Sequence, residues 1–152
     1  MDGFQLVDRI VALDPGRSIH TQKTWDPEAA YLKDHFPAFP VIPGVLLCEF
    51  MQQSGALCLE SAHPEYGKAL LLQIRNASFR TWVLPGQTVN AHIEVLAANA
   101  RLSRIRCCAE VDGAEVCSSE VRSVWTPWSE VGLSPKHPLL EAFEQSGTPR
   151  DD

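Results

Sequence analysis

Three prolines at every third position, followed by a proline-free apolar segment, constrain this chain more than any other feature. The loop that contains Pro37, Pro40 and Pro43 reads H-F-P-A-F-P-V-I-P-G. Each proline fixes its own φ and pushes the preceding residue away from the helical region, so we expect a stiff, extended loop. Proline is also favoured at the first position of a helix. Because the residues from Gly44 to Leu59 are mostly apolar, a buried helix is predicted to begin at Pro43.

The predicted helix carries a narrow polar stripe on an otherwise apolar surface. At about 100° per residue, the stripe consists of Glu49, Gln53, Ala56 and Glu60. Apolar side chains cover much of the remainder, namely Leu47, Phe50, Met51, Leu57 and Cys58. Carboxylates are rarely buried without a partner or a function. Glu49, in apolar company, is therefore a candidate functional residue.

A histidine, a carboxylate and a helix start together supply the groups that acid–base catalysis needs. His35 lies on the loop, Glu49 lies on the helix, and Gly44 lies at the helix N-terminus. There the backbone N–H groups are unpaired and the helix dipole is positive, which suits an oxyanion. Alone, His35 would more often be a surface or hydrogen-bonded histidine, and Gly44 would only ease the chain into the helix. For Gln53, one turn after Glu49, we favour a supporting role.

The same segment resembles the signature of the β-hydroxyacyl-(acyl carrier protein) dehydratases of fatty-acid synthesis, which have the hot-dog fold. That signature reads H-F-P-G-x-P-x-x-P-G-V-L-x-x-E-x-x-x-Q, and it appears here from His35 to Gln53. The resemblance implies that His35 and Glu49 are the catalytic pair and that the Gly44 amide is the oxyanion donor. It also implies supporting residues at the matching positions: Phe36, Pro43, Val45 and Gln53.

The chain departs from this signature at four positions. Ala38 replaces the usual glycine, and Phe39 makes the loop bulkier. Phe50 and Gln52 stand where the family usually has small residues. The catalytic pair is intact, but bulky side chains here would narrow or redirect an acyl tunnel. The identity of the acyl substrate and its chain length therefore stay open.

The remaining sequence predicts an antiparallel sheet. Residues 4–13 and 17–25 flank the turn signal Asp14-Pro15-Gly16 and are expected to form a hairpin, followed by a short helix over 26–32. Alternation and turn residues predict strands over 69–83, interrupted near Asn76, and over 88–96, 101–111 and 115–125. Asp112-Gly113 predicts a tight hairpin between the last two. This order predicts an α+β hot-dog fold, with an antiparallel sheet wrapped around one long central helix, over residues 1–125. Residues 126–152 are expected to be a partly disordered C-terminal extension, with helical turns over 139–144.

Composition excludes several classes of protein. In 152 residues with 45% hydrophobic content we expect one domain. No apolar run approaches the ~18 residues of a membrane span, and the start of the sequence lacks a secretory pattern, so we expect a soluble, cytoplasmic protein. The formal charge of −6 argues against nucleic-acid binding, and docking of an acidic carrier would need a local basic patch. Five cysteines without a C-x-x-C pair predict reduced core thiols and no metal site.

By resemblance, the protein is a lyase that dehydrates a 3-hydroxyacyl thioester to the trans-2-enoyl thioester in fatty-acid or polyketide-type synthesis. The resemblance implies no metal or redox cofactor, and it implies a substrate that is carried on the phosphopantetheine of acyl carrier protein. Two alternatives stay open, a hot-dog acyl-thioesterase and a non-catalytic hot-dog subunit of a heterodimer. We expect a homodimer or an assembly of dimers, because one sheet around one apolar helix leaves surface that a second copy would cover.

Overall fold

The computed structural model describes residues 5–28, 41–133 and 137–146. Its first elements are strands β1 (Arg9–Asp14) and β2 (Ser18–Thr24), which form an antiparallel hairpin. The predicted hairpin is therefore confirmed, although its first strand begins at Arg9 rather than at residue 4. The short helix predicted over 26–32 lies largely outside the described residues.

Helix α2 (Gly44–Ala62) is the central helix that the apolar segment predicted. Pro43 occupies the N-cap position rather than the first helical position. The helix packs so closely on the sheet that a Cβ atom at Gly55 would overlap the side chain of Ile105. A glycine is needed here because only a missing side chain allows this approach of helix and sheet. A single turn of 3-10 helix, η1 (Pro64–Tyr66), follows α2.

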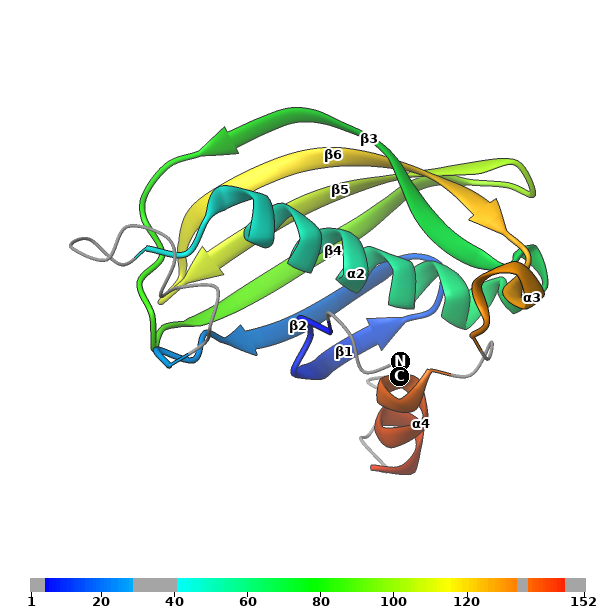
Figure 1. Ribbon diagram of the computed structural model, residues 1–152, viewed down its shortest axis with the longest axis horizontal. Helices are drawn as coiled ribbons and strands as arrows, with labels where there is room; N and C mark the ends of the chain where they lie inside the picture. Colours follow the sequence, from blue (N-terminus) through cyan, green and yellow to red (C-terminus); the bar gives the residue numbers. More distant parts are fainter. Residues whose placement is uncertain (1–4, 29–40, 134–136, 147–152) are drawn as a thin grey trace.

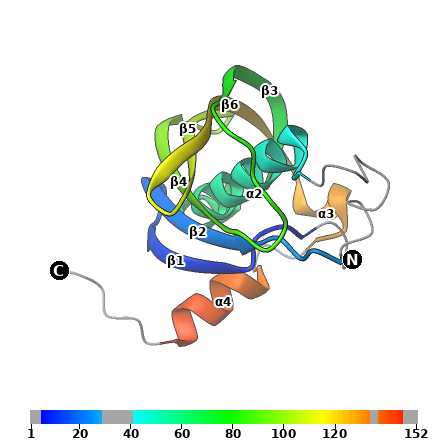
Figure 2. The ribbon, with the colours of Figure 1, turned by 90° about the vertical axis from the view of Figure 1, so that its left-hand side faces the viewer.

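Strands β3 (Lys68–Phe79), β4 (Thr88–Ala98), β5 (Leu102–Val111) and β6 (Ala114–Thr126) complete the sheet. In the described part of the chain the sheet has six strands in the order β1-β2-β4-β5-β6-β3, and all neighbours are antiparallel. Figures 1 and 2 show that the sheet curls around α2. The predicted α+β layout, a sheet wrapped around one long helix, is confirmed.

Three local predictions about the strands are also confirmed. Asp112 and Gly113, with φ of 51° and 81°, form the turn between β5 and β6, as Asp-Gly predicts for a two-residue hairpin. Asn76, with φ of 54°, lies where the pairing of β3 with β6 shifts register. The sheet turns its apolar side to α2, and Val89, Ala91 and Ile93 are buried on it, as alternation predicted.

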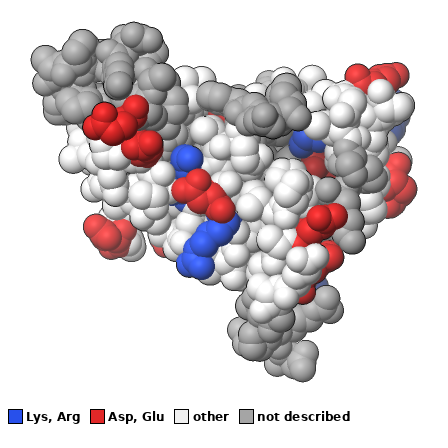
Figure 3. All heavy atoms as spheres, turned by 60° about the horizontal axis from the view of Figure 1, so that its bottom comes forward, with Lys and Arg blue, Asp and Glu red and all other residues white. Residues whose placement is uncertain are grey.

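The C-terminal segment adds helices α3 (Trp128–Val131) and α4 (Pro138–Gln145). The helical turns predicted over 139–144 are thus confirmed, while the proposed domain boundary at residue 125 stays a prediction. Figure 2 shows α4 beside β1, beyond the last strand of the sheet. On the face that carries these two elements, acidic groups lie near the few basic ones (Figure 3). No helix in the described ranges is long and apolar enough to cross a membrane.

Candidate active site

The N-terminal end of α2 supplies the first part of the site. The amides of Leu46 and Leu47 donate to the carbonyl of Pro43, at 3.0 and 3.4 Å. The amides of Gly44 and Val45 precede this first hydrogen bond, so they have no acceptor within the helix. Gly44 packs against Phe79, because a Cβ atom at Gly44 would lie 2.8 Å from the Phe79 ring. The helix start therefore lies next to the end of β3.

Glu49 and Gln53 form the second part of the site. The amide nitrogen of Gln53 donates to Oε1 of Glu49 at 3.1 Å, one helical turn away. The amide oxygen of Gln53 accepts from the backbone N–H of Leu6 at 2.8 Å. Glu49 itself is half-buried, while its helix neighbours Cys48 and Phe50 are buried. The carboxyl group thus has a fixed hydrogen-bond donor and an apolar surround on one side.

The structure brings together some of the residues that the sequence singled out. Pro43, Gly44 and Val45 form the start of α2, and Glu49 and Gln53 follow within its first three turns. Val45 is 73% exposed and so faces outward from this end of the helix. His35 and Phe36 lie outside the described residues. The predicted roles of all seven residues stay predictions.

Glu60 belongs to the same helical stripe, but the structure gives it a different task. It is 2% exposed, and its Oε2 accepts from Lys68 Nζ at 2.6 Å and from the backbone N–H of Ala69 at 3.1 Å. Burial raises the pKa of Glu60, and the ion pair with Lys68 opposes this rise. Glu60 therefore ties the end of α2 to the start of β3. Sequence reasoning missed this link, and the only signal was a basic residue after the breaker cluster at residues 63–67.

The buried thiols near Glu49 are poor nucleophiles. Among the described residues all five cysteines are free, and Cys48, Cys58, Cys107 and Cys117 are buried. Burial raises the pKa of Cys48, and it raises the pKa of Cys107 to about 12. A thiol reacts as its thiolate, so a raised pKa keeps these groups unreactive at neutral pH. The prediction of core thiols is confirmed for these four, whereas Cys108 is only partly buried.

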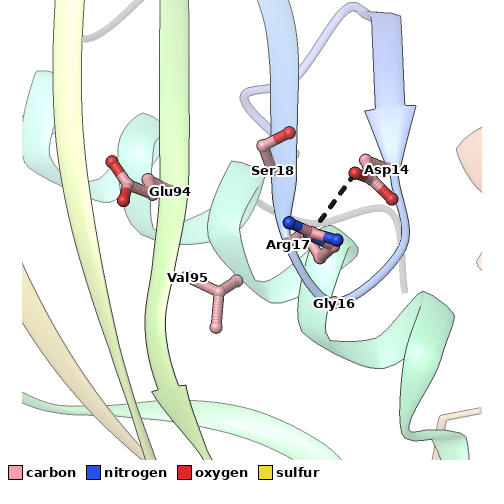
Figure 4. Close-up of a pocket in the computed structure, with 6 residues that line it drawn as sticks. All are labelled: Asp14, Gly16, Arg17, Ser18, Glu94 and Val95. Atoms are coloured by element: carbon pink, nitrogen blue, oxygen red, sulfur yellow. Dashed lines mark ion pairs between the residues drawn. The ribbon is translucent and has the colours of Figure 1, made fainter.

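A hollow of about 290 Å³ lies far from the helix start, at the turn between β1 and β2 (Figure 4). It is lined by Asp14, Gly16, Arg17, Ser18, Glu94 and Val95. Its charged groups are exposed and paired, Arg17 with Asp14 at 3.7 Å and Glu94 with Arg106 at 3.5 Å. Gly16 donates to the carbonyl of Cys58, near the C-terminal end of α2. The hollow shares no residue with the site around Gly44 and Glu49.

Comparison with known proteins now identifies the family. The family model of the FabA-like domain matches residues 1–120, which include the whole segment from His35 to Gln53. The chain belongs to the FabA-like family. One relative of this FabA-like chain, the 3-hydroxyacyl-(acyl-carrier-protein) dehydratase FabZ of Pseudoalteromonas translucida, is 37% identical over 119 residues, or 76% of this chain and 79% of the relative. The enzyme of the same name from Wolbachia pipientis is 33% identical over 122 residues, or 80% and 85% of the two chains.

Solved structures confirm the hot-dog fold of the FabA-like chain. The dehydratase heterocomplex ApeI:P from Xenorhabdus doucetiae matches with a TM-score of 0.69 and 13% identity, over 84% of this chain and 86% of that one. Thioesterase superfamily member 2 from Mus musculus matches with a TM-score of 0.61 and 8% identity, over 77% and 80% of the two chains. At these identities the likeness concerns the fold alone.

Proposed function

We propose that this protein dehydrates 3-hydroxyacyl thioesters carried on acyl carrier protein, in fatty-acid or polyketide-type synthesis. The observation that carries the proposal is the identity of 33–37% to relatives named for this reaction, over most of both chains. The segment from His35 to Gln53 lies inside the residues that the family model matches. The hydrogen bond between Gln53 and Glu49 and the exposed start of α2 support the same reaction.

His35 acts as the base and Glu49 as the acid in the proposed mechanism. His35 accepts the proton from Cα, and the electron pair of that C–H bond forms the C=C bond as the Cβ–O bond breaks. Glu49 gives its proton to the departing oxygen, which leaves as water. The thioester oxygen gains negative charge during this step, and the amide of Gly44 donates to it. Neither step requires a metal ion or a redox cofactor.

We further propose that the active unit is a homodimer in which Glu49 faces His35 of the partner subunit. Large apolar side chains that are exposed in the described structure gather on β3 and beside it, including Leu71, Leu72, Ile74, Phe79, Trp82 and Val45. Among the described strands β3 lies at the edge of the sheet and pairs with β6 alone, so an edge of this kind presents backbone groups to a further strand. Because Phe79 at its end contacts Gly44, a second copy paired along β3 reaches the start of α2. Pro43, Val45 and Phe36 would shape that junction.

The partner that delivers the substrate is an acidic carrier protein, so it needs a local basic patch on this chain of net charge −6. The face with β1 and α4 shows basic and acidic groups intermingled (Figure 3), so we expect docking elsewhere. We propose that the protein acts in the cytoplasm, as the start of the sequence leads us to expect.

A direct assay of a 3-hydroxyacyl carrier thioester tests the reaction. We expect the enoyl thioester as product, and turnover lower by roughly 10²–10⁴ in His35→Ala and in Glu49→Gln, the range for loss of a positioned acid or base. His92→Ala and Glu65→Gln change an exposed histidine and an exposed carboxylate and serve as matched controls. Release of free acid and thiol would instead identify a thioesterase, and absence of turnover would favour the non-catalytic subunit.

Mixing the two inactive variants tests the shared site. A heterodimer of His35→Ala and Glu49→Gln chains has one site with both changes and one site with neither. After free exchange about half of the dimers are mixed, so activity recovers to at most about one quarter of wild type. Parental activity in a mixture whose labelled chains have exchanged would contradict the shared site.

A further inference from the structure

Gln52 is a buried polar side chain whose amide makes no hydrogen bond within the described part of the chain. It lies on α2 and is 7% exposed, so the amide is not completely enclosed and a ligand group can approach it. An amide that leaves water without gaining a partner costs free energy, and such groups are rare in folded proteins. The buried amide of Gln52 therefore points to a partner that the described chain does not supply.

Two contacts between α2 and β3 show where the Gln52 side chain points. Gly44, at the start of α2, lies against Phe79 at the end of β3. Glu60, near the end of α2, accepts from the backbone N–H of Ala69 at the start of β3. The strand therefore runs antiparallel to the helix (Figure 1). Gln52 is midway between Gly44 and Glu60 in sequence, and at about 100° per residue its side chain also points midway between theirs. It therefore faces the middle of β3.

The position of Gln52 continues the line of the proposed reaction along α2. In that mechanism the thioester oxygen lies at Gly44 and the departing hydroxyl lies at Glu49. Gln52 follows Glu49 by three positions, so the two side chains are neighbours on the helix surface, and Gln52 lies about 4.5 Å further along the helix axis. An acyl chain that continues in the same direction reaches Gln52 a few carbons beyond the carbon that loses its hydroxyl.

We propose that Gln52 is a specificity-determining residue that binds a hydroxyl or keto oxygen on the distal part of the acyl chain. Its NH₂ group donates to either oxygen, and its carbonyl accepts from a hydroxyl. The preferred substrates are then 3-hydroxyacyl thioesters with a further oxygen on the chain, as in polyketide-type synthesis, rather than plain fatty-acyl chains. Gln52 is also one of the positions at which this chain departs from the dehydratase signature. The inference rests on the proposed function and adds the class of substrate.

A comparison of matched substrates tests this role. The substrates are the 3-hydroxyoctanoyl carrier thioester and its 3,5-dihydroxy and 3,7-dihydroxy analogues, and enoyl product is measured for each. We expect the wild-type kcat/KM to be higher for one of the dihydroxy chains by on the order of 10- to 10²-fold, because a plain chain leaves the buried amide unpaired.

Gln52→Met removes both hydrogen-bonding atoms and keeps the length of the side chain. We expect kcat/KM to fall for the preferred dihydroxy chain and to rise for the plain chain, because an apolar side chain then meets an apolar substrate. Opposite changes with two substrates do not follow from a merely structural defect. Gln52→Ala introduces a small residue of the kind usual at this position and should lose the same preference.

Gln22→Met is the matched control for the substitution. Gln22 lies on β2 next to Thr21, whose hydroxyl is hydrogen-bonded to that of Ser54 on α2 at 2.6 Å. Successive side chains of a strand point to opposite faces, so Gln22 faces away from α2. We expect Gln22→Met to keep the wild-type preference among the three substrates.

The outcomes distinguish the inference from the proposed function. Enoyl product from all three substrates at equal kcat/KM, or an unchanged preference in Gln52→Met, would overturn the role of Gln52 and leave the dehydration intact. An equal loss on all substrates, together with monomers in sedimentation of Gln52→Met, would assign the amide a partner in a second copy and would also overturn it. No enoyl product from any of the three substrates would overturn the proposed function and this inference together.

Discussion

The two edges of the sheet differ in almost every respect. β1 is six residues long and is covered by α4, whose Leu140 is 6% exposed and belongs to the same core as Ile10. β3 is twelve residues long and is exposed along nearly its whole length. Its exposed side chains include leucine, isoleucine and phenylalanine, and only one of its exposed residues, Arg75, carries a charge of the kind that usually protects an edge.

This difference shows that one edge of the sheet is covered by another element of the same chain and that the other edge is left open. Within the described residues both strands are paired on one side only, and an unprotected apolar edge is a site of pairing with another chain. The chain covers β1 with its own C-terminal helix (Figure 2). β3 also lies next to Gly44, at the candidate active site. We therefore infer that the covering of β1 stabilises the folded chain, whereas the open edge at β3 serves the active site.

A charge on the open edge should have the largest effect. Leu72 is 58% exposed in β3, and Leu72→Lys places an ammonium group where we expect a second copy. Sedimentation should show monomers, and turnover should fall by roughly 10²–10⁴, as if a catalytic group were missing. Leu133→Lys, at an exposed leucine that follows α3 and lies outside β3, is the control. A dimer of normal activity in Leu72→Lys would contradict the functional interpretation of this edge.

A cavity between α4 and β1 should lower the free energy of unfolding and leave kcat unchanged. Leu140→Ala removes buried methyl groups between α4 and β1, which should cost about 2–3 kcal/mol in the free energy of unfolding. Urea denaturation measures this loss, and kcat of the folded protein should match wild type. Glu144→Ala on the exposed side of α4 should change neither quantity. Loss of kcat in Leu140→Ala would mean that the covered edge also serves the site.

A methyl group at the helix start probes the junction between α2 and the open edge. A Cβ atom at Gly44 would lie 2.8 Å from the Phe79 ring, which is half exposed in the single chain and would be held by a partner. Gly44→Ala keeps the N–H donor. We therefore expect crowding alone to lower kcat/KM by the equivalent of about 1 kcal/mol of transition-state stabilisation. The double variant Gly44→Ala/Phe79→Leu should regain most of it. Equal loss in the single and double variants would place the cause elsewhere.

The buried thiols should give the smallest effect, and only in alkali. Burial raises the pKa of Cys58, beside the β1–β2 turn, to about 11 and that of Cys107, under β5, to about 12. Each raised pKa means that the unfolded chain loses its proton first, so stability is intact below pH ~9 and falls above it by about 1.4 kcal/mol per pH unit for each such thiol, until the pH reaches the pKa of that thiol in the folded protein. Urea unfolding at several pH values measures the slope. Cys58→Ala should make it shallower, and an unchanged slope would show that this thiol does not contribute.

Much of the local structure could be predicted from the sequence. Alternation in β4 identified the buried face that carries Val89, Ala91 and Ile93, and Asp112-Gly113 located a hairpin turn. Proline followed by an apolar segment located the start of α2 to within one residue. These features depend on neighbours within a few positions, and local backbone preferences and side-chain periodicity encode them directly.

Tertiary structure decided the contacts between distant parts of the chain. The helical period placed Glu49 and Glu60 on one stripe, yet Glu49 meets Gln53 and Glu60 meets Lys68. The sequence likewise gave no sign that the Leu6 amide donates to Gln53, that α4 covers β1, or that β3 lies at the open edge of the described sheet. Such contacts follow from how the sheet closes around the helix, since strand order and the packing of faces depend on the energy of the whole fold. The candidate residues could therefore be identified from the sequence, whereas the side chains and backbone groups that they contact were determined by the fold.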